Sequence, residues 1–365
     1  MQNLTRPWAG AVVISLAALA VAALWLAVPG SYPYGAAGRV TVGVNHWIER
    51  GPGAALLLGS GVLGLLLAGV RRSWPRVAAA GAVVEAAFFL LVMSDAAVLS
   101  SLGYALIPLS AAALLGLIVM GCLRRHPAGY AAAALVAAVA AGLVTGLIDA
   151  GPVAGYLGNL GKGFGDFGVR IAWSWGMAAG AAGWAWVAFA ALLPVSTAVA
   201  GPRRWGRVVT VLAALGAAPY ALARISWATP WPLLGFDPRT DRMVVLISGM
   251  DAATRLQGFL IGLGSVAAVV LTFGLISRWG EVFPRWLPVV GGREVPVRPA
   301  VGAGAAGAAA LCVSAPGVLA GAVQHSAWLD GVLFVVLFPC PVWGPLLAAA
   351  VYAYWVRRRT ATKPL

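Results

Sequence analysis

Long apolar stretches alternate with short polar segments along the whole chain. Ten of these stretches are close to the roughly 20 residues that a helix needs to cross the hydrocarbon core of a bilayer. The predicted spans cover residues 9–28, 54–70, 77–94, 103–122, 129–148, 171–193, 208–227, 256–276, 299–323 and 332–356. This pattern predicts an all-α, polytopic transmembrane helix bundle that forms a single integral-membrane domain over residues 1–365.

The composition indicates a membrane rather than water as the solvent of this chain. Hydrophobic residues make up 61% of the sequence and charged residues 10%, against roughly half and a quarter in soluble domains. These values exclude a soluble enzyme, and they make the lipid bilayer the expected partner. The net charge of +14 does not indicate a nucleic-acid partner, because the basic residues lie in short segments between spans, where orientation in the membrane explains them.

The placement of the basic residues predicts how the chain is oriented. Cytoplasmic segments of membrane proteins are enriched in Lys and Arg. If the amino terminus is cytoplasmic, the cytoplasmic segments hold 17 of the 25 basic residues and, of the acids, only Glu281 and Glu294. The basic residues are Arg6, Arg71, Arg72, Arg76, Arg124, Arg125, Arg203, Arg204, Arg207, Arg278, Arg285, Arg293, Arg298, Arg357, Arg358, Arg359 and Lys363. We therefore expect both termini in the cytoplasm and residues 29–53, 149–170, 228–255 and 324–331 outside.

Small residues and prolines inside the spans predict how the helices pack. Glycines four residues apart let helix backbones approach closely in lipid. Such pairs are Gly142 with Gly146, Gly176 with Gly180, Gly258 with Gly262, and Gly317 with Gly321. Prolines remove backbone hydrogen bonds, and we expect kinks at Pro108, Pro194, Pro219, Pro316, Pro339 and Pro341.

Most of the 16 tryptophans lie near predicted span ends, and Trp25, Trp173 and Trp227 are examples. Amphipathic rings prefer the membrane–water interface. We therefore expect them to be anchors at the membrane surface rather than a ligand-binding box.

The polar segment between the eighth and ninth predicted spans alternates aromatic and basic residues. Its sequence is Ser277-Arg-Trp-Gly-Glu-Val-Phe-Pro-Arg-Trp-Leu-Pro288, followed by Gly291-Gly-Arg-Glu-Val-Pro296. We expect it to lie along the headgroup layer or to dock a cytoplasmic partner. This segment resembles one in uncharacterised multi-pass membrane proteins of GC-rich Gram-positive bacteria. The resemblance implies a bacterial inner-membrane location and assigns no functional residue.

Two ionisable residues lie inside predicted spans, where such groups usually face a cavity or a partner. Glu85 is about eight residues, or roughly 12 Å, from the inner end of its span at 1.5 Å per residue. A carboxyl at that depth can belong to a proton relay, or it can be hydrogen-bonded across a helix interface. Arg224 lies near the outer end of its span, so its side chain can reach the headgroups.

Apart from Glu281 and Glu294, the remaining acids lie in outer segments. The candidates for a site on the outer face are Asp237, Asp241, Arg242 and Asp251. For these residues, and for the other outer polar groups, solvation in loops is the expected state. The other groups include Glu49, Arg50, Asp95, Asp149, Asp166, Arg170, His325 and Asp330.

No motif indicates a cofactor or a metal. Gly163-Phe-Gly-Asp-Phe-Gly168 matches GxGxxG, but no βαβ unit precedes it. The three cysteines, Cys122, Cys312 and Cys340, form no CxxC pair, and no histidine lies inside a span to bind haem. We expect no cofactor and no metal site.

Three functions remain open. The leading hypothesis is a permease-like protein in which Glu85 lines a polar pathway. The alternative is a non-catalytic membrane scaffold or accessory subunit with a membrane or cytoplasmic protein partner, in which Glu85 is satisfied by packing. The third is an integral-membrane enzyme acting on lipid or isoprenoid substrates, and it ranks last because no spacing singles out a catalytic pair. The surroundings of Glu85 separate these hypotheses.

Overall fold

The structure is a computed structural model that describes residues 5–35, 43–192, 203–237, 240, 242–285, 287, 290–325 and 327–361. It confirms the all-α, polytopic helix bundle. Ten helical segments among the described residues are long and apolar enough to cross a membrane, each overlapping one predicted span. Pro194, Asp241 and Lys363 lie outside the described residues.

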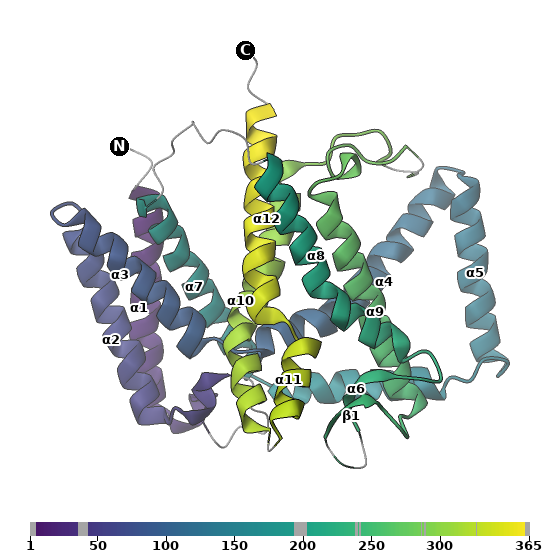
Figure 1. The fold of residues 1–365 in the computed structure, drawn as a ribbon, viewed down its shortest axis with the longest axis horizontal. Coiled ribbons are helices and arrows are strands. Elements are labelled where there is room, and N and C mark those ends of the chain that lie inside the picture. The colour runs from purple at the N-terminus through teal and green to yellow at the C-terminus, as the bar shows by residue number, and fades with distance from the viewer. Residues whose placement is uncertain are drawn as a thin grey trace. The chain divides into compact units, whose positions relative to one another are not determined.

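The helices group into two compact units, which we call unit 1 and unit 2 and describe separately. Unit 1 comprises Met1–Leu99, Asp166–Ala200 and Ala309–Gln324. Its first three helices and α7 pack in a ring, in which α1 and α3 each contact both α2 and α7 (Figure 1). The bounds are α1 Thr5–Ala27, α2 Arg50–Val70, α3 Pro75–Phe88 and α7 Arg170–Leu192.

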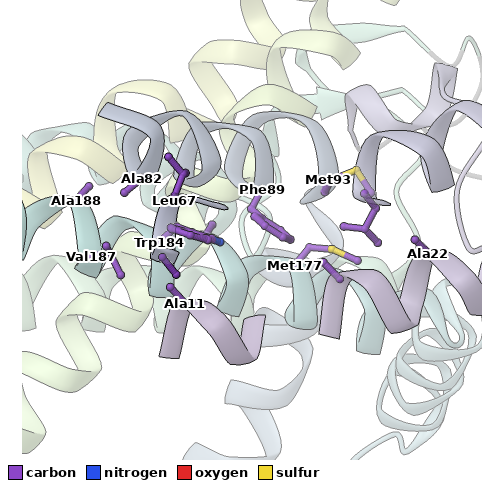
Figure 2. Packing of buried hydrophobic residues seen from close by; sticks show 14 of the residues in the cluster. Ala11, Ala22, Leu67, Ala82, Phe89, Met93, Met177, Trp184, Val187 and Ala188 are labelled. Carbon is purple, nitrogen blue, oxygen red and sulfur yellow. The ribbon is translucent and has the colours of Figure 1, made fainter. Parts of the chain in front are cut away.

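The core of unit 1 is a large tryptophan surrounded by small residues. Trp184 of α7 is fully buried, and Figure 2 shows it among Ala11 of α1, Leu67 of α2, Ala82 of α3 and Val187 of α7 itself. A Cβ atom added at Gly64 of α2 would lie 2.7 Å from Trp184, closer than van der Waals contact allows. Gly64 therefore makes room for the tryptophan, and the helices approach closely because this position has no side chain.

A π-helical turn ends the third span. Residues Phe89–Met93 form this turn, η4, directly after α3. The Ser94 amide donates to the Phe89 carbonyl at 3.0 Å, and the Ser94 hydroxyl donates to the same oxygen at 2.7 Å. Turns of this kind are rare and often mark functional positions. Here the turn places Asp95 just beyond the helix end.

Unit 2 comprises Ser100–Gly165, Gly201–Ala308 and His325–Leu365. Helix α8 packs against α9, α12 and α11, and a two-stranded antiparallel sheet, β1–β2, joins α8 to α9. Helix α10 is divided between the two units, and α4 and α6 each begin or end in unit 1. The bounds of the elements that lie wholly or partly in unit 2 are α4 Ala97–Leu123, α5 Pro127–Val144, α6 Gly151–Phe167, α8 Arg203–Ser226, β1 Leu233–Phe236, β2 Met243–Leu246, α9 Ala252–Gly274, α10 Val297–Gln324, α11 Trp328–Leu337 and α12 Cys340–Ala361.

Glycines at the α8–α9 contact confirm one packing prediction. An added Cβ at Gly258 of α9 would collide with the Trp227 ring, and one at Gly262 would lie 2.9 Å from the Ile225 amide nitrogen. In contrast, Gly176 of α7 has no neighbour within 4 Å of its added Cβ. Four-residue spacing therefore marks a close contact in α8–α9, whereas Gly176 has no such role.

The last span is broken, as its prolines predict. Helix α11 ends at Leu337, Phe338 adopts a non-helical conformation, and α12 begins at Cys340 after Pro339. Tyr220 of α8 and Phe334 of α11 lie against the Phe338 ring, with centroids 5.5 Å and 5.0 Å away. Aromatic rings therefore surround the break. Pro108, Pro219 and Pro316 lie inside continuous helices.

Helix α6 was not predicted from the sequence, which treats residues 149–170 as an outer segment. Its many glycines lower helix propensity. It packs through small contacts: Asn159 donates to Gln257 of α9 at 3.3 Å, and Phe164 lies 5.7 Å from Tyr104 of α4. Tertiary contacts of this kind stabilise a helix that its composition disfavours.

The segment between α9 and α10 is an ordered hairpin held by the end of α12. An isolated bridge joins Val282 to Glu294. Arg357 of α12 pairs with Glu281 at 3.2 Å, and Arg358 donates to the carbonyls of Glu281 and Val295 at 3.3 Å and 3.2 Å. The aromatic and basic sequence thus forms a folded element. Trp286 and residues 288–289 lie outside the described residues, and docking of a partner here stays a prediction.

Candidate functional site

Four buried polar residues of unit 1, which we call the Asp95 cluster, meet where α7 begins and η4 ends. They are Asn45, Asp95, Arg170 and Ser174. Asn45 comes from the short 3-10 helix η3 (Val44–Trp47), Arg170 is the first residue of α7, and Ser174 lies one turn further along α7. Three separate segments of chain therefore contribute to the cluster.

The Asp95 carboxylate accepts four hydrogen bonds. Its Oδ2 atom accepts from Arg170 Nε at 2.9 Å and from Asn45 Nδ2 at 3.1 Å. Its Oδ1 atom accepts from the Ser174 hydroxyl at 2.8 Å and from the Ala97 amide at 2.9 Å. Two carboxylate oxygens offer about four lone-pair sites. The carboxylate is thus saturated by the protein.

Arg170 makes hydrogen bonds to Asp95 and Asn45 and a ring contact with Tyr34. Its Nη2 atom donates to the Asn45 side-chain oxygen at 2.9 Å, and its guanidinium lies 5.5 Å from the centre of the Tyr34 ring. Asp95 is 0% exposed and Arg170 is 7% exposed. A positive charge at a helix amino terminus opposes the helix dipole, and the adjacent carboxylate compensates for it.

The backbone approaches Asp95 closely at Gly43. A Cβ atom added at Gly43 would lie 2.6 Å from the Asp95 Cβ and 2.9 Å from the Asn45 side-chain oxygen. Only a residue without a side chain fits there, because the surrounding groups are already at contact distance. Gly43 therefore lets η3 bring Asn45 onto the carboxylate.

Aromatic rings cover the Asp95 cluster. The buried Trp25 ring has its centre 5.0 Å from Tyr32, 5.8 Å from Tyr34 and 5.6 Å from Trp173. The Tyr32 hydroxyl donates to the Ile48 carbonyl at 2.7 Å. The prediction that Trp25 is a surface anchor is wrong: it is 0% exposed and forms the centre of a packed aromatic group. Position near a span end does not distinguish a ring that faces lipid from one that faces the bundle.

Burial shifts the pKa values of the two tyrosines. Desolvation raises the pKa of Tyr32 to about 12, and the Arg170 charge opposes this shift. Desolvation also raises the pKa of Tyr34 well above its usual range, the Asp95 charge adds to the shift, and Arg170 and Ser174 oppose it. Both phenols are therefore neutral around neutral pH.

The prediction that Asp95 and Arg170 are solvated in loops is wrong, because both side chains are buried. Both lie directly at the boundary of an apolar stretch, where a charge faces either the headgroups or the bundle. The sequence does contain a signal, since Ser174 follows Arg170 by one helical turn and so shares its face. Asn45, in a segment without periodicity, has no such signal.

Glu85 lies on a buried helix interface. It is 1% exposed, and its Oε2 atom accepts a hydrogen bond from the Ser60 hydroxyl of α2 at 2.5 Å. Ser60 is also buried. The arrangement joins α2 to α3 through one buried polar contact.

Arg224 lies in the last turn of α8 and contacts the ring of Tyr220 in the same helix and the ring of Trp227 just after the helix end. Its Cζ atom is 4.1 Å from the centre of the Trp227 ring and 5.1 Å from the centre of the Tyr220 ring. The Nε atom is buried and has no hydrogen-bond partner among the described residues. Glu85 belongs to unit 1 and Arg224 to unit 2.

The candidates predicted on the outer face form separate local contacts. Arg242 pairs with Asp330 through two hydrogen bonds of 3.1 Å and 3.3 Å, and this pairing raises the pKa of Arg242. Asp251 caps α9 by accepting from Thr254, which lowers the pKa of Asp251. Asp237 accepts from Ser248 at 3.3 Å. The described candidates therefore have different partners.

No group of three His, Cys, Asp or Glu side chains that could hold a metal occurs within the part of the chain that the structure describes. Comparison with protein families, curated protein sequences and solved structures finds no match for this chain. Functional interpretation therefore depends on the geometry of these residues.

Proposed function

We propose that the chain is a non-catalytic scaffold or accessory subunit of a bacterial cell membrane, with both termini in the cytoplasm. The observation that carries the proposal is the packing of Glu85 against Ser60, in which a mid-span carboxyl joins two helices. Buried polar contacts of this kind hold helices together in lipid, where hydrophobic association is weak.

The Asp95 cluster supports the same proposal. A pathway for a polar solute needs groups that can exchange protein contacts for the solute. The Asp95 carboxylate already accepts four protein hydrogen bonds, and Arg170 is bonded to Asp95 and Asn45. Opening this site costs several buried hydrogen bonds, each contributing about 1 kcal/mol or more when charged. A structural role needs no such opening.

Permease-like transport is the second candidate, and the break between α11 and α12 favours it. Discontinuous helices line binding sites in many transporters, and Pro339 interrupts the last span. At this break, the rings of Tyr220 and Phe334 pack against Phe338. The enzyme hypothesis has less support, because Arg242 and Asp251 are engaged in an ion pair and a helix cap.

Proton conduction separates the scaffold from a Glu85 relay. Purified protein is reconstituted into vesicles that enclose a pH-sensitive dye, and a potassium gradient with valinomycin drives proton entry. The scaffold proposal predicts that wild type, Glu85→Gln and protein-free vesicles acidify at the same rate. Glu85→Gln keeps the shape and an acceptor for Ser60, so it should also unfold at nearly the wild-type temperature.

Glu85→Leu is the matched control for packing. It removes the acceptor and leaves the Ser60 hydroxyl without this partner, so we expect a loss of about 1–3 kcal/mol of stability. Proton entry that is faster in wild type than in Glu85→Gln vesicles, from equally folded protein, would overturn the proposal in favour of a relay.

A further inference from the structure

Arg224 differs from the other arginine candidates in lacking a polar partner. It makes no hydrogen bond and no ion pair with any residue that the structure describes, and its buried Nε atom is unsatisfied. Arg170 and Arg242, in contrast, are each paired with an aspartate. A buried donor without a partner costs about 1–3 kcal/mol. The two Nη atoms of Arg224 are not among the buried atoms, so they are the donors that a ligand can reach.

The frame around Arg224 is fixed. Trp227 is buried, its Nε1 atom donates to the Leu233 carbonyl at 3.0 Å, and its ring fills the space above Gly258. Tyr220 packs on Phe338 at 5.5 Å. Because both rings are held by other elements, the guanidinium between them has a defined place before any ligand arrives.

Nearby acids that the structure describes are engaged elsewhere. Asp330 pairs with Arg242, Asp251 caps α9, and Asp237 accepts from Ser248. A second guanidinium, that of Arg255, donates to the carbonyls of Thr229 and Met250 at 2.6 Å and 3.3 Å. None of these three carboxylates pairs with Arg224.

The chemistry of the site matches an anionic oxygen group at the membrane surface. A guanidinium is planar and matches phosphate geometry with paired donors. Arg224 lies two residues from the end of the candidate span Arg204–Ser226, where phosphates of lipids lie and where Trp and Tyr rings are favoured. We propose that Arg224, between Tyr220 and Trp227, binds the phosphate of a membrane phospholipid. This inference is independent of the role of Glu85.

The test measures lipid binding to the purified protein in detergent by native mass spectrometry. The probes are phosphatidylglycerol, phosphatidylcholine and a diacylglycerol with the same acyl chains but no phosphate. Both phospholipids should form adducts, and diacylglycerol should not. Inorganic phosphate and glycerol 3-phosphate provide the soluble source of the same group, and neither should displace the bound phospholipid at millimolar concentration.

Arg224→Gln should weaken phospholipid binding by roughly tenfold to a hundredfold, the effect of losing charge-assisted hydrogen bonds. Arg242→Gln is the matched control, because it removes one positive charge from unit 2 at an arginine that already has a partner, and its binding should stay at the wild-type level. Arg224→Lys keeps the charge without the planar donors and should bind more weakly than wild type.

Three results would overturn the inference. They are equal binding of diacylglycerol and phosphatidylglycerol, displacement of the lipid by free phosphate, and equal loss in Arg224→Gln and Arg242→Gln. If Arg224→Gln does not fold, Arg224→Lys decides the question, and wild-type affinity in that variant would reject the site.

Discussion

Each unit contains an arginine–aspartate pair, and the two pairs differ in burial. In unit 1, the side chains of Arg170 and Asp95 are 8% and 0% exposed, and the Nε–Oδ2 distance is 2.9 Å. In unit 2, the side chains of Arg242 and Asp330 are 58% and 6% exposed, at 3.1 Å. The two nitrogen–oxygen distances are nearly equal, so the two ion pairs differ in their burial and not in their geometry.

The buried pair belongs to a network of side chains, whereas the carboxylate of the other pair adds one backbone partner, Met243. Asn45 and Ser174 bind the same carboxylate as Arg170, whereas the two hydrogen bonds of Arg242 and Asp330 join only those two side chains. A buried charge that loses its partner cannot regain hydration. An exposed guanidinium, such as that of Arg242, stays hydrated when its partner is removed. The surroundings therefore determine what each pair does for stability.

Breaking the buried pair should have the largest effect on stability. We expect Arg170→Met and Asp95→Asn each to lower the free energy of unfolding by about 3–5 kcal/mol, because each leaves a buried charge uncompensated. The double variant should be more stable than Arg170→Met alone. Unfolding in a denaturing detergent, followed by circular dichroism, measures all three. Additive losses would show that the two charges are not coupled.

The tyrosines near the Asp95 cluster predict an intermediate effect that depends on pH. Tyr32 ionises at about pH 12 in the folded protein and at about pH 10 in an unfolded chain. Its contribution to stability is therefore complete below about pH 10 and is lost as the pH rises toward 12.

Tyr32→Phe should flatten the fall in stability between pH 10 and pH 12, because phenylalanine does not ionise. Its loss of the hydrogen bond to Ile48 should cost about 1 kcal/mol at neutral pH. Ultraviolet absorbance of tyrosinate gives the ionisation directly. A Tyr32 that titrates near pH 10 in the folded protein would show that water reaches the aromatic cover.

The smallest effect should come from the pair with the exposed arginine. Arg242→Gln should lower the unfolding temperature less than Arg170→Met, because the Arg242 side chain is 58% exposed and the buried Asp330 keeps its hydrogen bond to the Met243 backbone. High salt should reduce the difference in unfolding temperature between wild type and Arg242→Gln, because salt screens exposed charges. A loss as large as that of Arg170→Met would show that burial is not what distinguishes the two pairs.

The helices were predictable from the sequence, but the Asp95 cluster was not. Apolar stretches define spans because lipid requires internally bonded helices of a fixed length, and all ten overlap the helical segments found. Glu85 was identified because a charge inside a span is rare. Asp95 and Arg170 lie at span ends, where charges are common, and only the packing of η3 and the π-helical turn shows that they are buried.

The proposal rests most directly on whether water reaches Ser60, the partner of Glu85. In a background without Cys122, Cys312 and Cys340, Ser60→Cys is exposed to a membrane-impermeant thiosulfonate from both sides of opened membranes. Trp47→Cys, at an exposed position of η3, is the positive control. A scaffold predicts rapid labelling of Trp47→Cys and no labelling of Ser60→Cys. Labelling of both at similar rates would reveal an aqueous path to Glu85 and contradict the account.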